Sequence, residues 1–154
     1  MRQGRQPGKI TILFLCTGNS CRSQMAEGWA RHLRPEAIEP YSAGIERHGV
    51  NPLAVRVMAE AGVDIAGQES KLIAELPRQE FDYVITLCDH AHETCPYLPA
   101  RVARIHQGFA DPPRLAASAT DEEGRLRPYR QVRDALRAFV VSLPETLLNL
   151  SEQR

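Results

Sequence analysis

A seven-residue segment that begins with a cysteine and ends with an arginine constrains this chain more than any other feature. Cys16-Thr17-Gly18-Asn19-Ser20-Cys21-Arg22 joins the apolar run of residues 9–15 to residues 22–33, where apolar side chains recur at helical spacing. A loop between a strand and a helix can curl its N–H groups around a tetrahedral oxyanion, and the helix N-terminus adds positive potential there. Gly18 and Asn19 tolerate the left-handed backbone that this curl needs. The segment therefore predicts an anion cradle.

Two side chains of this loop predict its chemistry. The planar fork of Arg22 can hold two oxyanion oxygens. Cys16 lies where the donors converge, and because the amides, the helix terminus and Arg22 favour its thiolate, we expect its pKa to lie well below that of a free thiol. Ser23 offers a further hydrogen bond to the sulfur. The alternative is a chance cysteine and arginine at this spacing, but the strand before the loop and the helix after it argue against chance.

The rest of the chain alternates predicted strands with predicted helices. This alternation predicts an α/β fold, with one three-layer domain over residues 9–150 and a four-stranded, mainly parallel sheet that helices cover on both faces. Residues 1–8 are expected to form a flexible N-terminal extension. We expect strands at residues 9–15, 37–42, 81–87 and 102–106. We expect helices at residues 22–33, 52–61 and 129–150, and an exposed polar loop at residues 118–127.

The composition excludes several classes of partner. Lysine plus arginine and aspartate plus glutamate each number 19, so the formal net charge is zero and no global field attracts nucleic acid or an anionic membrane. The apolar run before Cys16 is too short for a signal peptide or a membrane span, so we expect a cytoplasmic protein. In that reducing compartment, the four cysteines need a metal, a catalytic or redox role, or burial as small hydrophobic residues.

Cys88 and Cys95 lie seven positions apart, after the third predicted strand. In an intact helix this spacing separates two residues by about 10 Å along the axis, whereas a disulfide needs alpha carbons within about 7 Å. A disulfide between them therefore requires an unwound or irregular segment, and the spacing predicts a redox-driven rearrangement. The alternatives are two buried thiols, or a zinc site made with Cys16 and Cys21. Zinc fits poorly, because structural sites favour pairs separated by only about two to four residues, and we expect no metal.

The segment from Cys16 to Ser23 resembles the phosphate loop of the low-molecular-weight protein tyrosine phosphatases and of the arsenate reductases that share their fold. Residues 24–29, Gln-Met-Ala-Glu-Gly-Trp, resemble the reductases, because the phosphatases usually carry proline after the serine. Residues 41–45 and 48–52 extend the resemblance, which covers nearly the whole chain and implies a low-molecular-weight phosphatase-like fold. It also implies that the oxyanion is bound by Thr17, Gly18, Asn19, Ser20, Cys21, Arg22 and Ser23.

The resemblance further assigns a general acid. The segment from Phe109 to Pro113 matches the family position of an aspartate held above the anion, here Asp111. When a thiolate attacks a tetrahedral oxyanion an oxygen must leave, and Asp111 can protonate it. The alternative is an ordinary Asp-Pro turn. Phosphatases of this family tend to carry an aromatic residue after the Asp-Pro pair, where Pro113 stands in this chain.

The thioredoxin-coupled arsenate reductases carry the same late cysteine pair, which implies a thiol-disulfide relay. Cys16 forms an adduct with arsenate, Cys88 attacks the sulfur of Cys16 so that arsenite leaves, and Cys95 then attacks Cys88. Thioredoxin is the implied reductant, phosphate is the competing anion, and no cofactor is expected. Cys21 is expected to be a bystander thiol or a protective partner.

Some relatives bind potassium beside the loop through residues at positions like Asn19 and Glu27, together with the segment that corresponds to residues 68–71. In this chain we expect Lys71 to place its ammonium where the relatives place the ion. The alternative is a solvated helix lysine.

Three other functions stay open from the sequence. The first is a phosphatase acting on phosphotyrosine through Cys16, Arg22 and Asp111, for which the late cysteine pair has no use. The second is a non-enzymatic anion or metal sensor. The third keeps the reductase but replaces thioredoxin with glutaredoxin or a small thiol.

Overall fold

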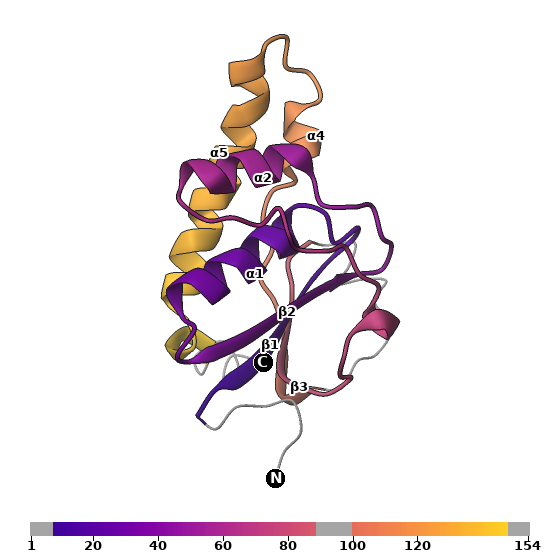
Figure 1. Ribbon diagram of the computed structural model, residues 1–154, viewed down its shortest axis with the longest axis vertical. Helices are drawn as coiled ribbons and strands as arrows, with labels where there is room; N and C mark the ends of the chain where they lie inside the picture. The colour runs from indigo at the N-terminus through magenta and orange to yellow at the C-terminus, as the bar shows by residue number, and fades with distance from the viewer. Residues whose placement is uncertain (1–7, 89–99, 148–154) are drawn as a thin grey trace.

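A four-stranded parallel sheet lies at the centre of the computed structural model, which describes residues 8–88 and 100–147 (Figure 1). Its strands are β1 (Ile10–Cys16), β2 (Ile38–Gly44), β3 (Phe81–Thr86) and β4 (Ala100–His106). They lie in the order β2-β1-β3-β4, and every pairing between them is parallel. The predicted α/β class and parallel sheet are therefore confirmed. Because β1 is an inner strand, the loop that follows Cys16 has neighbours on both sides.

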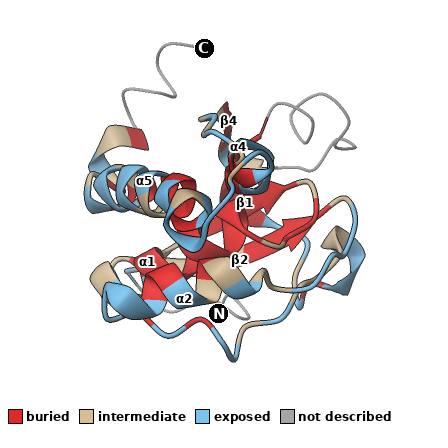
Figure 2. Ribbon diagram, turned by 90° about the horizontal axis from the view of Figure 1, so that it is seen from above, coloured by how far each residue is buried: buried red, intermediate tan, exposed pale blue. Residues whose placement is uncertain are grey.

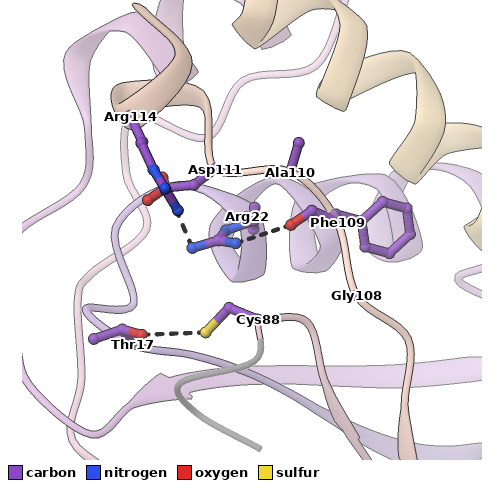
Figure 3. Close-up of a pocket in the computed structure, with 8 residues that line it drawn as sticks. All are labelled: Thr17, Arg22, Cys88, Gly108, Phe109, Ala110, Asp111 and Arg114. Carbon is purple, nitrogen blue, oxygen red and sulfur yellow. Dashed lines mark hydrogen bonds and ion pairs between the residues drawn. The ribbon is translucent and has the colours of Figure 1, made fainter. Parts of the chain in front are cut away.

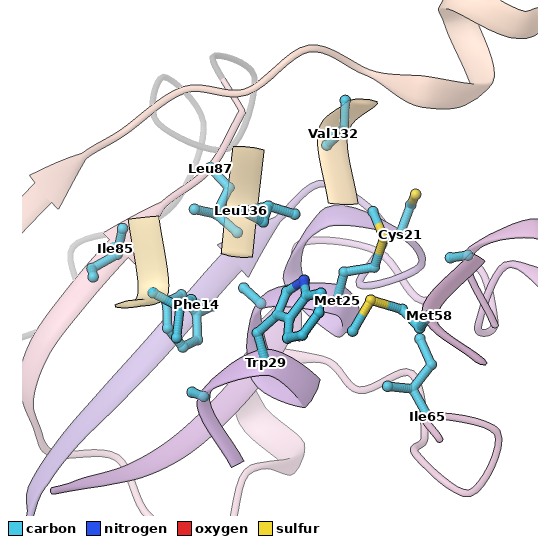
Figure 4. Packing of buried hydrophobic residues seen from close by; sticks show 14 of the residues in the cluster. Phe14, Cys21, Met25, Trp29, Met58, Ile65, Ile85, Leu87, Val132 and Leu136 are labelled. Carbon is cyan, nitrogen blue, oxygen red and sulfur yellow. The ribbon is translucent and has the colours of Figure 1, made fainter. Parts of the chain in front are cut away.

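Three helices form the larger part of the core. They are α1 (Arg22–Leu33), α2 (Pro52–Glu60) and α5 (Glu122–Val141). Their apolar side chains share one buried cluster with Ile12 and Phe14 of β1, and Figure 4 shows this packing around Trp29. The indole Nε1 of Trp29 donates to the carbonyl of Arg133 at 3.0 Å, which satisfies its only polar atom inside the core.

The opposite face of the sheet carries a second, smaller cluster. Leu13 and Leu15 alternate with Ile12 and Phe14 along β1. They pack in a cluster with Ile73 of the 3₁₀ helix η1 (Ile73–Glu75) and with Leu76, which follows that helix. The inner strands are buried on both faces, as Figure 2 shows, which is the usual state of a parallel sheet. None of the helices in the described ranges is both long and apolar enough to cross a membrane.

The last helix differs from the sequence prediction. It begins at Glu122, inside the segment predicted to be an exposed loop, and it ends at Val141 rather than near residue 150. The carboxylate of Asp121 caps its first turn by accepting from the amide of Gly124 at 2.7 Å. The fully buried Leu126 begins the apolar stripe there. The polar residues and Gly124 had favoured a loop, but the cap and the buried stripe stabilise a helix there.

A short helix that the sequence did not predict, α4 (Pro112–Ala116), follows β4 and contacts α5. Asp111 is its N-cap residue and Pro112 its first residue, a position where the missing N–H costs little. The Asp-Pro pair, for which a turn was the alternative interpretation, is therefore the start of a helix that holds Asp111 at the carboxyl end of the sheet. The carboxyl ends of β1 and β3 supply the other candidate residues described below.

Candidate active site

The predicted anion loop lies between the last residue of β1, Cys16, and the first residue of α1, Arg22. Its carbonyl groups are held by neighbouring segments. Backbone amides of residues 46, 48 and 51 donate to the carbonyls of Thr17, Gly18 and Ser20, at 2.9–3.0 Å. Gln24 Nε2 donates to the carbonyl of Asn19 at 3.0 Å. The outer side of the loop is therefore saturated with hydrogen bonds that fix its curvature.

The loop amides are available for an anion. Among the described residues, none accepts a hydrogen bond from the backbone amides of residues 17–21. Asn19 has a φ of 47°, the left-handed value that curls successive N–H groups toward one centre. Its side chain stabilises that conformation by donating to Ser23 Oγ at 2.8 Å and accepting from the amide of Lys71 at 2.7 Å. The predicted oxyanion-binding residues therefore form one cradle.

Two glycines let other segments approach this loop. Gly44, paired with Cys16 across the sheet, has no room for a Cβ, which would lie 2.6 Å from the amide nitrogen of Asn19. A Cβ on Gly18 would lie 2.2 Å from Nδ1 of His48. A side chain at either glycine would therefore displace the loop or its support.

A pocket of about 500 Å³ opens above the loop. It is lined by Thr17, Arg22, Cys88, Gly108, Phe109, Ala110, Asp111 and Arg114 (Figure 3). Of these residues, Phe109 directs its ring away from the pocket and packs it against Phe139, with 5.8 Å between ring centroids. The side chains that line the pocket are consequently short or charged, which suits a small anion.

Arg22 and Asp111 face each other in this pocket. Arg22 Nη1 donates to the carbonyl of Phe109 at 2.9 Å, and Nη2 lies 3.8 Å from Asp111 Oδ1. No group in the described part of the chain accepts a hydrogen bond from the buried Nε of Arg22, and an unsatisfied buried donor favours an incoming acceptor. The Asp111 side chain is 42% exposed and accepts no hydrogen bond from the start of α4. It is therefore accessible to a bound anion.

Cys88 brings a second thiol to the loop. It lies just after β3, and it and Cys16 are each 4% exposed and form a small buried cluster with Ile45. The sulfur of Cys88 is 3.1 Å from Thr17 Oγ1, and the two groups share a hydrogen bond. Both thiols therefore lie in one small buried cluster beside the loop. Cys95 lies outside the described residues.

The pKa of Cys16 is raised well above that of an ordinary thiol, which corrects the expectation of a lowered one. The hydrogen bond with Cys88 is the largest cause and burial is the next, while Arg22 and the backbone amide of Ser23 act in the opposite direction. The expected decrease took account of the loop amides, Arg22 and Ser23, but not of the neighbouring thiol of Cys88. The thiolate of Cys16 therefore needs either a break in its contact with Cys88 or a base that takes its proton.

Cys21 differs from the other two described thiols. It is 4% exposed and belongs to the main core, and burial raises its pKa to about 12. Neither a zinc site nor a reactive thiol is supported by this environment, since cysteine reacts and binds metal as the thiolate. Its contribution to the cradle is limited to its backbone.

The residues expected near a potassium ion are already paired with protein groups. The Glu27 carboxylate accepts from Ser42 and forms an ion pair with Arg31, one turn along α1. Asn19 Oδ1 accepts from the Lys71 amide, and Lys71 Nζ donates to the carbonyl of Glu69 at 2.8 Å. Lys71 is not on a helix, but it shares a pocket with Glu27 and Arg31. This donor set does not fit an added cation, and Arg31, which the sequence analysis missed, balances the buried charge.

The chain is similar to known proteins over most of its length. Residues 11–150 match the model of the family described as low molecular weight phosphotyrosine protein phosphatase. The arsenate reductase of Halalkalibacterium halodurans is 49% identical over 138 residues, which cover 90% of this chain and 97% of that protein. The arsenate reductase of Bacillus subtilis is 47% identical over 135 residues, which cover 88% and 95%.

The fold of the chain is also similar to that of a solved structure. The structure described as an arsenate reductase in the phosphate binding state superposes with a TM-score of 0.64 at 34% identity, and the match covers 91% of this chain and 97% of that one.

Proposed function

The chain belongs to the low molecular weight phosphotyrosine protein phosphatase family, and we propose that within this family it acts as an arsenate reductase with Cys16 as nucleophile. One observation carries the proposal. The thiol of Cys88 contacts Cys16 under the anion pocket. Hydrolysis of a phosphate ester uses a thiolate, an arginine and a general acid, but it has no use for a second thiol. A reduction needs two electrons, and two thiols that join in a disulfide supply them.

The first step forms a bond between sulfur and arsenic. Arsenate occupies the cradle of loop amides and the fork of Arg22. Because the pKa of Cys16 is raised, we infer that the bound dianion takes the proton of the thiol, after which Arg22 and the Ser23 amide stabilise the thiolate. The thiolate attacks arsenic, and an As–O bond breaks as Asp111 protonates the departing oxygen, which leaves as water.

The second step reduces arsenic. The thiolate of Cys88 attacks Sγ of Cys16, the S–S bond forms, and the S–As bond breaks with its electron pair going to arsenic. As(V) becomes As(III), arsenite leaves, and the two sulfurs are oxidised to a disulfide. The Thr17 hydroxyl, 3.1 Å from the Cys88 sulfur, holds this nucleophile in the pocket. Phosphate fills the same cradle and competes with arsenate.

The last steps regenerate the loop thiol. The thiolate of Cys95 attacks Cys88, Cys16 leaves as a thiolate, and the disulfide moves to Cys88 and Cys95. A dithiol protein of the thioredoxin type then reduces this disulfide and supplies the two electrons. The relay requires a reducing compartment, which agrees with the cytoplasmic location expected from the sequence. No cofactor or metal takes part in these steps.

A weak phosphatase activity accompanies this function in our proposal. Cys16, Arg22 and Asp111 suffice for attack on a phosphate ester, but the ring of Phe109 packs into the core and offers no surface to an aryl group. The direct test is arsenite formation by the purified protein with thioredoxin, thioredoxin reductase and NADPH. Arsenate-dependent NADPH oxidation with matching arsenite supports the proposal, whereas efficient aryl phosphate hydrolysis without arsenite formation contradicts it.

A further inference from the structure

Arg114 is a second arginine at the pocket that holds Arg22 and Asp111. It stands on the exposed side of α4, three positions after Asp111, and Figure 3 shows its side chain extending toward the pocket. Within the described residues, its guanidinium takes part in no hydrogen bond or ion pair, whereas Arg22 binds the carbonyl of Phe109 and faces Asp111. The planar donor fork of Arg114 is therefore available at the mouth of the site.

We propose that Arg114 is a specificity-determining residue that captures doubly charged tetrahedral oxyanions at the mouth and passes them to the cradle. This inference rests on the proposed function for its substrate, arsenate, but it concerns the capture of the anion and not its reduction. The same chemistry applies to inorganic phosphate, which has the same shape and charge.

The charges of the pocket carry the argument. Arg22 and Arg114 bring two guanidinium groups to the pocket lining, and Asp111, 3.8 Å from Arg22, brings one carboxylate. Without Arg114, the single guanidinium of Arg22 would face a doubly charged anion with a carboxylate beside it. Arg22 lies deep in the pocket and keeps one fork nitrogen on the Phe109 carbonyl, so its remaining donors cannot surround all the anion oxygens.

The position of Arg114 supports a role in capture. An exposed cation at the rim of a pocket attracts anions from solution and raises their rate of entry, an effect that added salt weakens. Because Asp111 is the N-cap residue of α4 and Arg114 lies within that helix, the same element fixes the two side chains relative to each other. Arg114 was not predicted as a functional residue, since an isolated arginine is most often a solvated surface residue.

The test compares Arg114→Gln and Arg114→Lys with Arg125→Gln, a matched loss of an exposed arginine outside the pocket. Titration calorimetry measures the Kd of inorganic phosphate for each reduced protein, and steady-state assays measure KM and kcat for arsenate at several salt concentrations. Arg114→Gln should raise both the Kd and KM by roughly three- to tenfold, the range for an exposed charge-assisted contact. It should leave kcat nearly unchanged and flatten the salt dependence of kcat/KM.

Arg114→Lys should fall between the wild type and Arg114→Gln, because it keeps the charge but loses the fork. Arg125→Gln should match the wild type. An unchanged phosphate Kd in Arg114→Gln overturns the inference, and so does a fall in kcat with unchanged KM, which would place Arg114 in the chemistry. Phosphate binding does not require reduction, so failure of the wild type to form arsenite would refute the proposed function while leaving this test intact.

Discussion

Cys88 lies in contact with Cys16 although Cys16 is the last residue of β1 and Cys88 follows β3, and both thiols are shielded from solvent. The parallel pairing of these neighbouring strands brings their carboxyl ends together, and the Thr17 hydroxyl holds the Cys88 sulfur beside the loop. When a second thiol contacts the cysteine of a phosphatase-like loop, the two thiols can supply two electrons by forming a disulfide.

Replacing Cys16 with serine should lower arsenate reduction by more than about 10³-fold, because the nucleophile of a covalent mechanism is lost. Hydrolysis of an aryl phosphate should fall with it. The cradle amides and Arg22 remain, so calorimetry should still detect phosphate binding. Residual arsenite formation near the wild-type rate would show that another thiol attacks arsenic.

Cys88→Ser should separate the two activities. Arsenite formation with the thioredoxin system should stop, because no thiol remains beside the adduct, whereas slow hydrolysis of an aryl phosphate should persist. Circular dichroism and thermal unfolding establish that the variant is folded. Equal loss of both activities in a folded variant would mean that Cys88 supports the site instead of transferring electrons.

Cys88→Ala should lower the pKa of Cys16, because the hydrogen bond with Cys88 is the largest cause of its raised value. The thiolate reacts with iodoacetamide and the thiol does not, so the midpoint of the alkylation rate against pH should move to lower pH in the variant. Peptide mapping assigns the label to Cys16. Cys21, with a pKa of about 12, stays protonated over most of this range. A midpoint that moves to higher pH would contradict the assigned cause.

Exchange of potassium for sodium should change turnover and thermal stability very little, because Arg31 pairs with Glu27 and Lys71 binds the Glu69 carbonyl. Arg31→Ala leaves the Glu27 carboxylate buried without its cation, so the variant should unfold at lower temperature. Potassium should then restore part of its stability by mass action. Marked stimulation of the wild type by potassium would refute the account of this region.

The loop and the first helix could be predicted from the sequence because their signals are local. The strand before Cys16, the residues that allow a left-handed turn, and the helix from Arg22 lie within one short stretch. The four strands were also predicted, β1 and β3 from short and mostly apolar runs, and β2 and β4 with less exact bounds because both contain polar residues. The start of helix α5 was misplaced, because the polar residues before Leu126 and the glycine at position 124 are local loop signals that a cap and core packing outweigh.

Contacts between distant residues could not be predicted in the same way. Thr17 and Cys88 are 71 positions apart, and nothing in either local sequence indicates their hydrogen bond. The raised pKa of Cys16 depends on such a contact, which explains why the local argument gave the wrong direction. The pairing of Arg31 with Glu27 has helical spacing and could have been noticed from the sequence.

The most direct test of the central claim is a single turnover of arsenate by Cys95→Ser in the absence of any added reductant. Cys16 and Cys88 alone complete the electron transfer in the proposed relay, so the variant should release about one arsenite per protein in a burst and then stop. Peptide mapping of the alkylated, unreduced protein should find a disulfide between Cys16 and Cys88, whereas the wild type should accumulate one between Cys88 and Cys95. If the variant released no arsenite, Cys95 would have to act before arsenic is reduced, and the proposed pairing of Cys16 with Cys88 as the reducing couple would be wrong.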